Sequence, residues 1–125
     1  MAFIDVKYPE MRQEVASALA ALADPEYQQR VWIDRKYSRE NFYDDLTLNI
    51  NILYDMVLPD PRSRIGTVLV SENEVGHLAR LEEVLGPLVA ELRDAPDSRY
   101  LSDPRWEEVV VAAGSALSSM DPVGN

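Results

Sequence analysis

Carboxylates between residues 40 and 60 are the side chains of this sequence best suited to chemistry. Asp44 and Asp45 are adjacent, and Asp55 and Asp60 follow in the same short segment. Hard divalent cations prefer carboxylate oxygens, so such a group could hold Ca²⁺ or Mg²⁺. The spacing does not favour this, because the EF-hand pattern is absent and adjacent side chains on a helix point about 100° apart. We therefore predict neither a metal site nor a cofactor.

Other catalytic side chains are scarce. The absence of Cys excludes thiol catalysis and Cys-ligated zinc, and the single His, His77, has no second imidazole to pair with. His77 falls at the edge of an apolar helical stripe, which is typical of a surface or core-edge histidine. No GxxxxGK phosphate loop occurs, and Ser71 and Ser102 stand at positions typical of helix caps. We predict that the protein is not an enzyme.

The charge of the chain restricts its partners. Its 125 residues contain 22 acidic and 12 basic side chains, a formal net charge of −10. An acidic protein repels phosphate backbones and anionic lipid headgroups, so we expect no nucleic-acid and no membrane partner. The sequence contains no apolar run long enough to span a bilayer and no secretory signal at its beginning. Together with the absence of Cys, these features predict a cytoplasmic protein.

Aromatic side chains gather beside the acidic segment. Six of the ten aromatic residues lie between residues 27 and 54, and no base interrupts residues 40 to 60. Aromatic groups provide contact area at low entropic cost, which is typical of protein interfaces. Two alternatives stay open, because the aromatic residues can also fill a core and the acids can form a solvated surface. The candidate interface residues are Tyr37, Tyr43, Asp44, Asp45, Asp55 and Asp60.

Two Asp-Pro pairs predict the starts of helices. In Asp24-Pro25 and Asp103-Pro104 the Asp can cap the first amides, while Pro occupies the first turn, where its missing N–H is not needed. These starts predict helices over residues 25 to 33 and 104 to 119. Each helix carries an aromatic residue near its start, and we expect Trp32 and Trp106 to lie in the core.

Apolar periodicity predicts two further helices. Residues 9 to 23 carry apolar side chains at steps of three and four, as on one face of a helix. Residues 72 to 93 show the same pattern after a capping box formed by Ser71 and Glu74. Gly86-Pro87 should kink or break this long helix, because Pro removes a backbone hydrogen bond and clashes with the preceding turn.

The middle of the chain fits two kinds of structure. Residues 46 to 53 alternate between apolar and polar as a half-buried strand would, and residues 65 to 70 form a second β-branched run with which they could pair. Residues 42 to 57 fit a helix equally well, and we favour the helix because an isolated two-stranded ribbon is marginally stable. The predicted fold is mainly α: one compact domain of about five helices over residues 1–125, with room for a short two-stranded β element and with flexible ends at 1–8 and 120–125.

Several short patterns suggest a relationship. They are Asp24-Pro25-Glu26-Tyr27-Gln28-Gln29, Val31-Trp32, Asp44-Asp45, Leu53-Tyr54-Asp55, Ile65-Gly66, Glu74, Tyr100-Leu101 and Pro104-Arg105-Trp106. These patterns resemble those of an uncharacterised family of small acidic actinobacterial proteins over nearly the whole chain. More loosely, the chain is similar to helical immunity proteins of contact-dependent growth inhibition systems.

Two functional hypotheses follow. The looser resemblance implies a non-enzymatic protein-binding module of the immunity type, which would inhibit a basic toxin domain. Toxin domains that grip nucleic acid are usually basic, and an acidic inhibitor can be steered to such a site by charge. The alternative is a small adaptor or regulatory domain of unknown partner, either a monomer or a homodimer, in which acidity serves only solubility.

Overall fold

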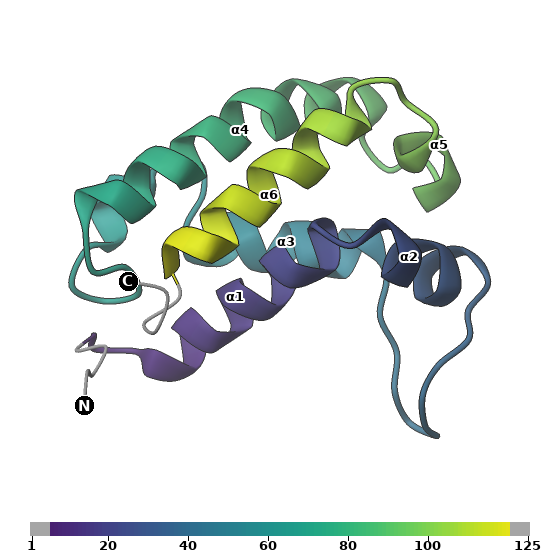
Figure 1. The fold of residues 1–125 in the computed structure, drawn as a ribbon, viewed down its shortest axis with the longest axis horizontal. Helices are drawn as coiled ribbons and strands as arrows, with labels where there is room; N and C mark the ends of the chain where they lie inside the picture. The colour runs from purple at the N-terminus through teal and green to yellow at the C-terminus, as the bar shows by residue number, and fades with distance from the viewer. Residues whose placement is uncertain (1–5, 121–125) are drawn as a thin grey trace.

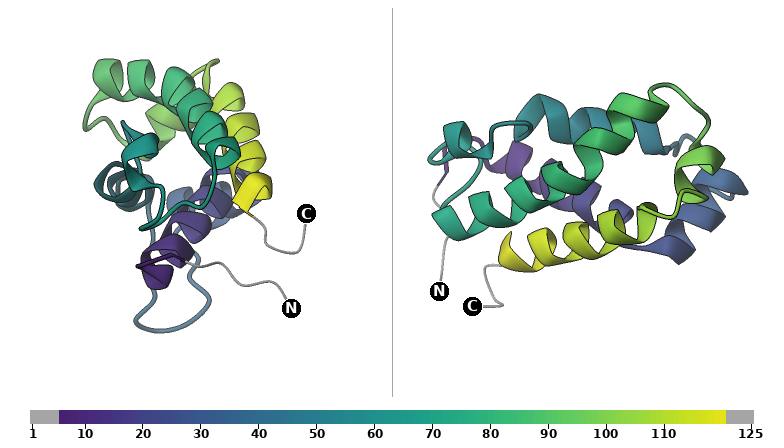
Figure 2. Two further views of the ribbon diagram at one scale, coloured as in Figure 1. Left: turned by 90° about the vertical axis from the view of Figure 1, so that its left-hand side faces the viewer. Right: turned by 90° about the horizontal axis from the view of Figure 1, so that it is seen from above.

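Four long helices build the structure, a computed structural model that describes residues 6–120. They are α1 (Pro9–Leu22), α3 (Leu46–Met56), α4 (Glu72–Leu92) and α6 (Trp106–Met120). Helix α4 packs along α6, and α1 packs against both α3 and α6 (Figure 1). Buried apolar side chains from all four helices form one core cluster, and Figure 2 shows the arrangement of the helices from two further sides. The mainly α prediction is confirmed.

Short elements connect the long helices. After α1 come one turn of α-helix, α2 (Pro25–Tyr27), and a π-helical segment, η1 (Gln28–Ile33). A 3-10 turn, η2 (Pro61–Arg64), precedes α4, and α5 (Asp97–Leu101) precedes α6. No helix between residues 6 and 120 is both long enough and apolar enough to cross a bilayer.

The favoured helix in the middle of the chain is confirmed, and the alternative strand pair does not form among residues 6–120. Residues 46 to 56 form α3, and the run from 65 to 70 contains only an isolated bridge between Ile65 and Leu69. Helix is favoured because Asp45 caps α3 by accepting a hydrogen bond from the Leu48 amide at 2.8 Å. Because Asp45 is the cap, α3 begins at Leu46 and not at residue 42 as expected. Residues 42 to 45 lie in the preceding loop.

The long helix α4 begins as predicted and does not break. Ser71 Oγ accepts a hydrogen bond from the Glu74 amide at 3.3 Å. Pro87 lies inside α4, which continues to Leu92. Pro87 is on the exposed side, where water can reach the freed carbonyl, while Leu85 and Leu88 on either side are fully buried in the core. Burial of this stripe offsets the lost hydrogen bond.

The two Asp-Pro pairs behave differently. Asp24 caps α2 through the Tyr27 amide at 3.1 Å, and the helical segment ends at Ile33 as predicted. The second pair does not start a helix at Pro104, because α6 begins at Trp106. Asp103 is buried and accepts hydrogen bonds from the backbone and side chain of Arg105. Its carboxylate therefore joins a network of charges.

A buried ion pair ties the helices together. The Arg12 guanidinium, on α1, contacts the Glu74 carboxylate, on α4, at 2.6 and 2.9 Å. It also donates to the carbonyl oxygens of Val68 and Met120 at 3.0 Å. Glu74 accepts a further hydrogen bond from the Val70 amide at 2.8 Å, so its role differs from that of a capping-box glutamate. One guanidinium thus links α1, the loop before α4, α4 itself and the last turn of α6.

The ends of the chain were predicted to be flexible over 1–8 and 120–125. Residues 1–5 and 121–125 lie outside the described residues. The amides of Lys7 and Tyr8 donate to the carbonyls of Gly66 and Thr67 at 3.0 and 2.8 Å. Met120 is buried at the end of α6. These contacts attach both described ends to the helical body.

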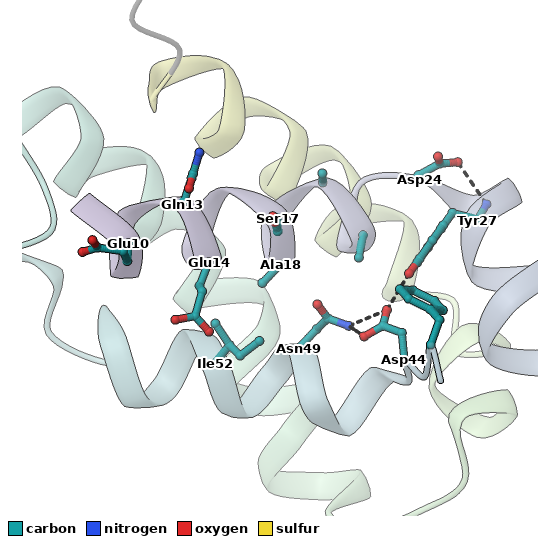
Figure 3. A pocket seen from close by; sticks show the side chains of 13 residues that line it. Glu10, Gln13, Glu14, Ser17, Ala18, Asp24, Tyr27, Asp44, Asn49 and Ile52 are labelled. Carbon is teal, nitrogen blue, oxygen red and sulfur yellow. Dashed lines mark hydrogen bonds between the residues drawn. The ribbon is translucent and has the colours of Figure 1, made fainter. Parts of the chain in front are cut away.

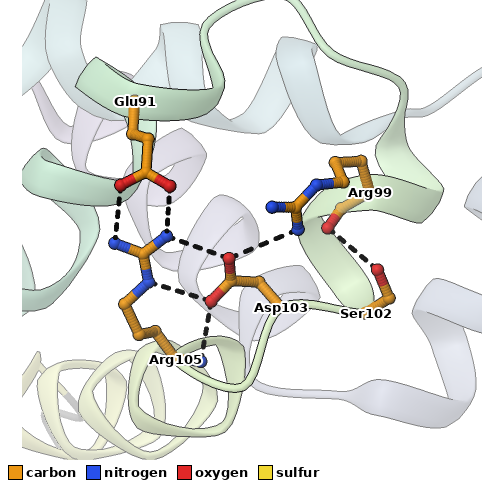
Figure 4. Close-up of polar contacts among 5 residues, drawn as sticks. All are labelled: Glu91, Arg99, Ser102, Asp103 and Arg105. Atoms are coloured by element: carbon orange, nitrogen blue, oxygen red, sulfur yellow. Dashed lines mark hydrogen bonds and ion pairs between the residues drawn. The ribbon is translucent and has the colours of Figure 1, made fainter.

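A network of ion pairs joins α4, α5 and the start of α6 (Figure 4). Arg105 contacts Glu91 at 3.1 Å and Asp103 at 2.9 Å, and Arg99 contacts Asp103 at 3.3 Å. Hydrogen bonds from Arg105 hold the pKa of the Asp103 carboxyl well below its usual 3.8, with a smaller contribution from Arg99. The same contacts raise the pKa of Arg105. Asp103 therefore remains ionised in the folded protein at acidic pH.

The depressed pKa of Asp103 predicts a loss of stability in acid. A carboxyl whose folded pKa is lowered contributes stability that is fully present above about pH 5 and is lost as pH falls below about 4 through the folded pKa. Asp103→Asn should therefore reduce the pH dependence of the free energy of unfolding, measured by urea denaturation between about pH 3 and 6.

Asp97 provides a control, because its expected effect on the pH dependence of stability has the opposite sign. Burial raises the pKa of Asp97, so this group favours the folded state as pH falls. Asp97→Asn keeps an oxygen that can accept from the Leu46 amide, and it should steepen the acid loss. Equal effects of the two substitutions would contradict the assignment to Asp103.

Candidate partner-binding surface

A groove runs between α1 and α3 (Figure 3). We call it the α1/α3 groove; its volume is about 780 Å³. Four carboxylates line it, and none of the described residues lining it is basic. They are Glu10, Glu14, Asp24 and Asp44. The groove therefore combines negative charge with a concave shape.

Apolar side chains also line the α1/α3 groove. Ile52 from α3 and Phe42 from the loop before α3 are partly exposed there. A partner side chain can therefore bury apolar area between the carboxylates, which gives contact energy that charge alone does not supply at an exposed site.

Helix α1 presents its carboxylates because its other face is committed to the core. Val15, Leu19 and Leu22 are fully buried, so residues on the opposite side of α1 face solvent. Glu10 and Glu14 are exposed there, one turn apart. No ion pair joins either of them to a base among residues 6–120. Both are available to an external cation.

Asp44 closes one end of the groove and is held from three sides. Its carboxylate accepts from the Tyr27 hydroxyl at 2.8 Å, from Trp32 Nε1 at 2.9 Å and from Asn49 Nδ2 at 2.9 and 3.0 Å. Burial raises the pKa of Tyr27, and the hydrogen bond to Asp44 raises it further. Asp44 thus joins α2, η1 and α3, and it is far less free than a solvated surface carboxylate.

We expect Asp44→Ala to lower the free energy of unfolding by about 1.5 to 3 kcal/mol, because buried donors lose a charged acceptor. Chemical denaturation measures the change. Asp55→Ala is the matched control, since Asp55 is an exposed acid of the same segment and such positions usually change stability by under about 0.5 kcal/mol. Equal stability of the two variants would show that the Asp44 contacts contribute nothing.

The acidic segment from 40 to 60 does not form one face. Asp45 caps α3 at its start and also accepts a hydrogen bond from the Tyr43 hydroxyl. Asp55 lies in the last turn of α3, about 15 Å farther along the helix axis, and Asp60 is exposed beyond it. Of the six residues proposed for an interface, Asp44 alone lines the α1/α3 groove.

Tyr37 and Tyr43 belong to the segment that we call the aromatic loop, residues 34–45. The Tyr37 ring packs against Phe42 and Tyr43, with centroid distances of 6.0 and 5.8 Å. The Arg39 guanidinium lies over Phe42 at 5.7 Å. Tyr43 is 52% exposed. The aromatic loop projects from the helical body (Figure 1), and its residues Phe42 and Asp44 line the groove.

Two groove carboxylates were not singled out from the sequence. Glu10 and Glu14 are an i,i+4 acidic pair on the polar face of a helix whose apolar stripe is evident. That pattern predicts their exposure. Their role in a groove depends on α3 packing beside α1, which no local pattern indicates.

A cluster of metal-ligating side chains is absent from the described part of the chain. Among residues 6–120, no three His, Asp or Glu side chains are grouped so that they could hold a metal ion. His77 lies partly buried on α4. The α1/α3 groove is a stronger candidate site than the surroundings of His77, because it combines a concave shape, negative charge and apolar surface.

Comparison with protein families gives one match. A family model described as "Domain of unknown function (DUF7945)" matches residues 6–122. The chain belongs to this family. No curated protein and no solved structure matches the chain. The DUF7945 match contains α1, α3 and the aromatic loop, and it agrees with the resemblance to an uncharacterised family.

Proposed function

We propose that this DUF7945 chain is a non-enzymatic protein-binding module that receives a basic partner surface in the α1/α3 groove. The observation that supports the proposal is the groove, which the exposed Glu10 and Glu14 line together with the apolar side chains of Phe42 and Ile52. A basic side chain entering there gains charge complementarity at its head and apolar burial along its stem.

A more specific form of this proposal is that the chain is an immunity-type inhibitor. The partner would be a basic toxin domain, and the setting a bacterial cytoplasm. The net charge of −10 supports it, because opposite charge accelerates encounter with a basic protein. The resemblance to helical immunity proteins points the same way. Such an inhibitor would block the nucleic-acid site of the toxin without doing chemistry.

The test compares two double charge reversals of equal size. Glu10→Lys/Glu14→Lys changes the groove, and Glu107→Lys/Glu108→Lys changes exposed carboxylates in the first turn of α6. Basic proteins retained from a lysate of the native host are identified with the unmodified chain. Each one is then purified, and its association rate is measured with all three forms in low and high salt.

Groove reversal should slow association and weaken its salt dependence, because steering by charge acts mainly on the association rate. Reversal on α6 should have a smaller effect, since those carboxylates lie outside the groove. A basic partner that binds the groove variant as fast as the unmodified chain would refute this function. Recovery of no basic protein at all would refute it as well.

A further inference from the structure

A buried amide lines the end of the α1/α3 groove that Asp44 closes. Asn49, on α3, is 4% exposed and lines this end. Its Nδ2 donates to the two carboxylate oxygens of Asp44 at 2.9 and 3.0 Å and to the carbonyl oxygen of Asp45 at 2.8 Å. Its Oδ1 accepts no hydrogen bond from any residue between 6 and 120. The nitrogen of this amide is therefore fully used, and its oxygen is not.

The orientation of the Asn49 amide is fixed by its neighbours. Turning the amide over would set Oδ1 against three acceptor oxygens of Asp44 and Asp45, which repel it. Figure 3 shows Oδ1 on the side of the amide that faces away from Asp44. Every sealed side-chain oxygen and nitrogen among residues 6–120 has a partner, so Oδ1 is open to the groove. An acceptor with so little access to water favours a donor from a ligand.

A second oxygen at this end also has room for a donor. Asp44 Oδ1 accepts only from Asn49 Nδ2, whereas Asp44 Oδ2 accepts from Tyr27, Trp32 and Asn49. Asn49 Nδ2 is 2.9 Å from Asp44 Oδ1, and Asn49 Oδ1 belongs to the same amide group. One donor nitrogen can therefore reach both oxygens. Because one of them carries negative charge, the donor that fits best is a cation with several N–H groups.

Two bases of the chain lie near this end but do not reach these oxygens. Arg30 lies over the Tyr27 ring at 5.8 Å, and Arg39 lies over the Phe42 ring at 5.7 Å. Neither base lines the groove, and among residues 6–120 no hydrogen bond or ion pair joins either of them to Asp44. A cation for these oxygens therefore comes from outside the described chain.

The hydrogen bonds on Asp44 favour an ammonium group over a guanidinium group. A guanidinium group binds a carboxylate best through two parallel hydrogen bonds, one to each oxygen. Asp44 Oδ2 already accepts three hydrogen bonds, so this fork cannot form. An ammonium group is compact, and its three donors can each use a single acceptor. The stem of a lysine side chain can pack on the partly exposed Phe42 and Ile52.

We propose that the closed end of the α1/α3 groove binds one lysine side chain of the basic partner, whose ammonium group donates to Asn49 Oδ1 and Asp44 Oδ1. This assignment rests on the proposed function and adds the residue type that the partner must present. Glu10 and Glu14 lie toward the other end of the groove (Figure 3) and attract bases by charge alone, so they accept lysine and arginine alike.

Three short peptides test the lysine site on the unmodified chain. They are Ac-Gly-Lys-Gly-amide, the same peptide with arginine, and the same peptide with Nε-acetyllysine. Each is titrated into the isotope-labelled full chain at constant ionic strength, and nuclear magnetic resonance follows the side-chain amide signals of Asn49. The lysine peptide should shift these signals, and the uncharged acetyllysine peptide should leave them in place. The arginine peptide should act there at least about tenfold more weakly, because it cannot form its fork.

Asn49→Ala tests the role of the amide oxygen. It should weaken binding of the lysine peptide by about tenfold or more, because a hydrogen bond to a charged group is lost, and it should weaken the arginine peptide less. Asn51→Ala is the matched control, since Asn51 is exposed on the same helix and does not line the groove. Circular dichroism confirms that both variants fold. If Asn49→Ala does not fold, the peptide series on the unmodified chain still decides the question.

A lysine peptide that leaves the Asn49 side-chain signals in place would overturn the lysine site, as would an arginine peptide that binds there equally well. The proposed function is judged separately, by the association rates of basic proteins with the Glu10→Lys/Glu14→Lys chain. Partners that depend on those two carboxylates but show no preference for lysine at Asn49 would leave that function intact. A lysine peptide that binds at Asn49 while every basic protein ignores the groove would overturn the partner protein as the source of the ammonium group, and a small amine would then be its source.

Discussion

Arg12→Ala should lower the free energy of unfolding by about 3 to 5 kcal/mol, because it leaves the Glu74 carboxylate charged and buried without its partner. Glu74 is 1% exposed. The carbonyl oxygens of Val68 and Met120 lose their donor in the same substitution. Equilibrium denaturation by urea measures the change.

Arg80→Ala is the matched control for Arg12. Arg80 pairs with Glu83 at 3.2 Å on the exposed side of α4, and such surface pairs contribute under about 1 kcal/mol. Arg12→Met/Glu74→Leu should recover part of the loss, because replacing both charges removes the stranded carboxylate. Arg12→Ala and Arg80→Ala with the same stability would contradict the role assigned to the buried pair.

Trp106→Ala should cost about 3 to 5 kcal/mol, since it removes a large buried side chain from a small domain. Trp106 is 5% exposed, and its ring meets Tyr100 edge to face at 6.4 Å. Its Nε1 donates to Gln28 Oε1 at 3.0 Å, so truncation also leaves the buried Gln28 short of a partner. Thermal and chemical denaturation both report the loss.

Two further substitutions separate packing from hydrogen bonding at Trp106. Trp106→Phe keeps most of the apolar area but loses the N–H donor and some ring volume, so it should cost about 1 to 3 kcal/mol. Val111→Ala, at a position that is 63% exposed on the same helix, should change stability by under about 0.5 kcal/mol. A Trp106→Ala protein as stable as Val111→Ala would place the indole outside the core.

The sequence predicts the long helices well because their apolar spacing is local information. Val15, Leu19 and Leu22 are buried as the pattern of α1 requires, and the predicted core positions of Trp32 and Trp106 are confirmed. The secondary structure of residues 46 to 53 was ambiguous because their apolar positions fit both the helical and the strand periodicity. The cap by Asp45 and the packing of α3 on α1 decide for the helix.

Polar contacts between segments that are distant in the chain could not be predicted from the sequence. In the sequence Asp44 is one of several acids in a segment without a base. The fold brings three donors to it: the Tyr27 hydroxyl from α2, the Trp32 indole from η1 and the Asn49 amide from α3. Arg12 and Glu74 stand 62 positions apart. Such pairs follow from tertiary packing, so the groove could be described only after the helices were placed.

The position of Trp32 gives the protein an optical reporter of its own groove. The chain contains only two tryptophans, and the indole of Trp32 is hydrogen-bonded to Asp44 at the closed end of the groove. Indole emission responds to nearby charge and to the strength of its N–H hydrogen bond. A Trp106→Phe protein would therefore emit from Trp32 alone, and titration with any groove ligand could be followed by intrinsic fluorescence without attaching a dye.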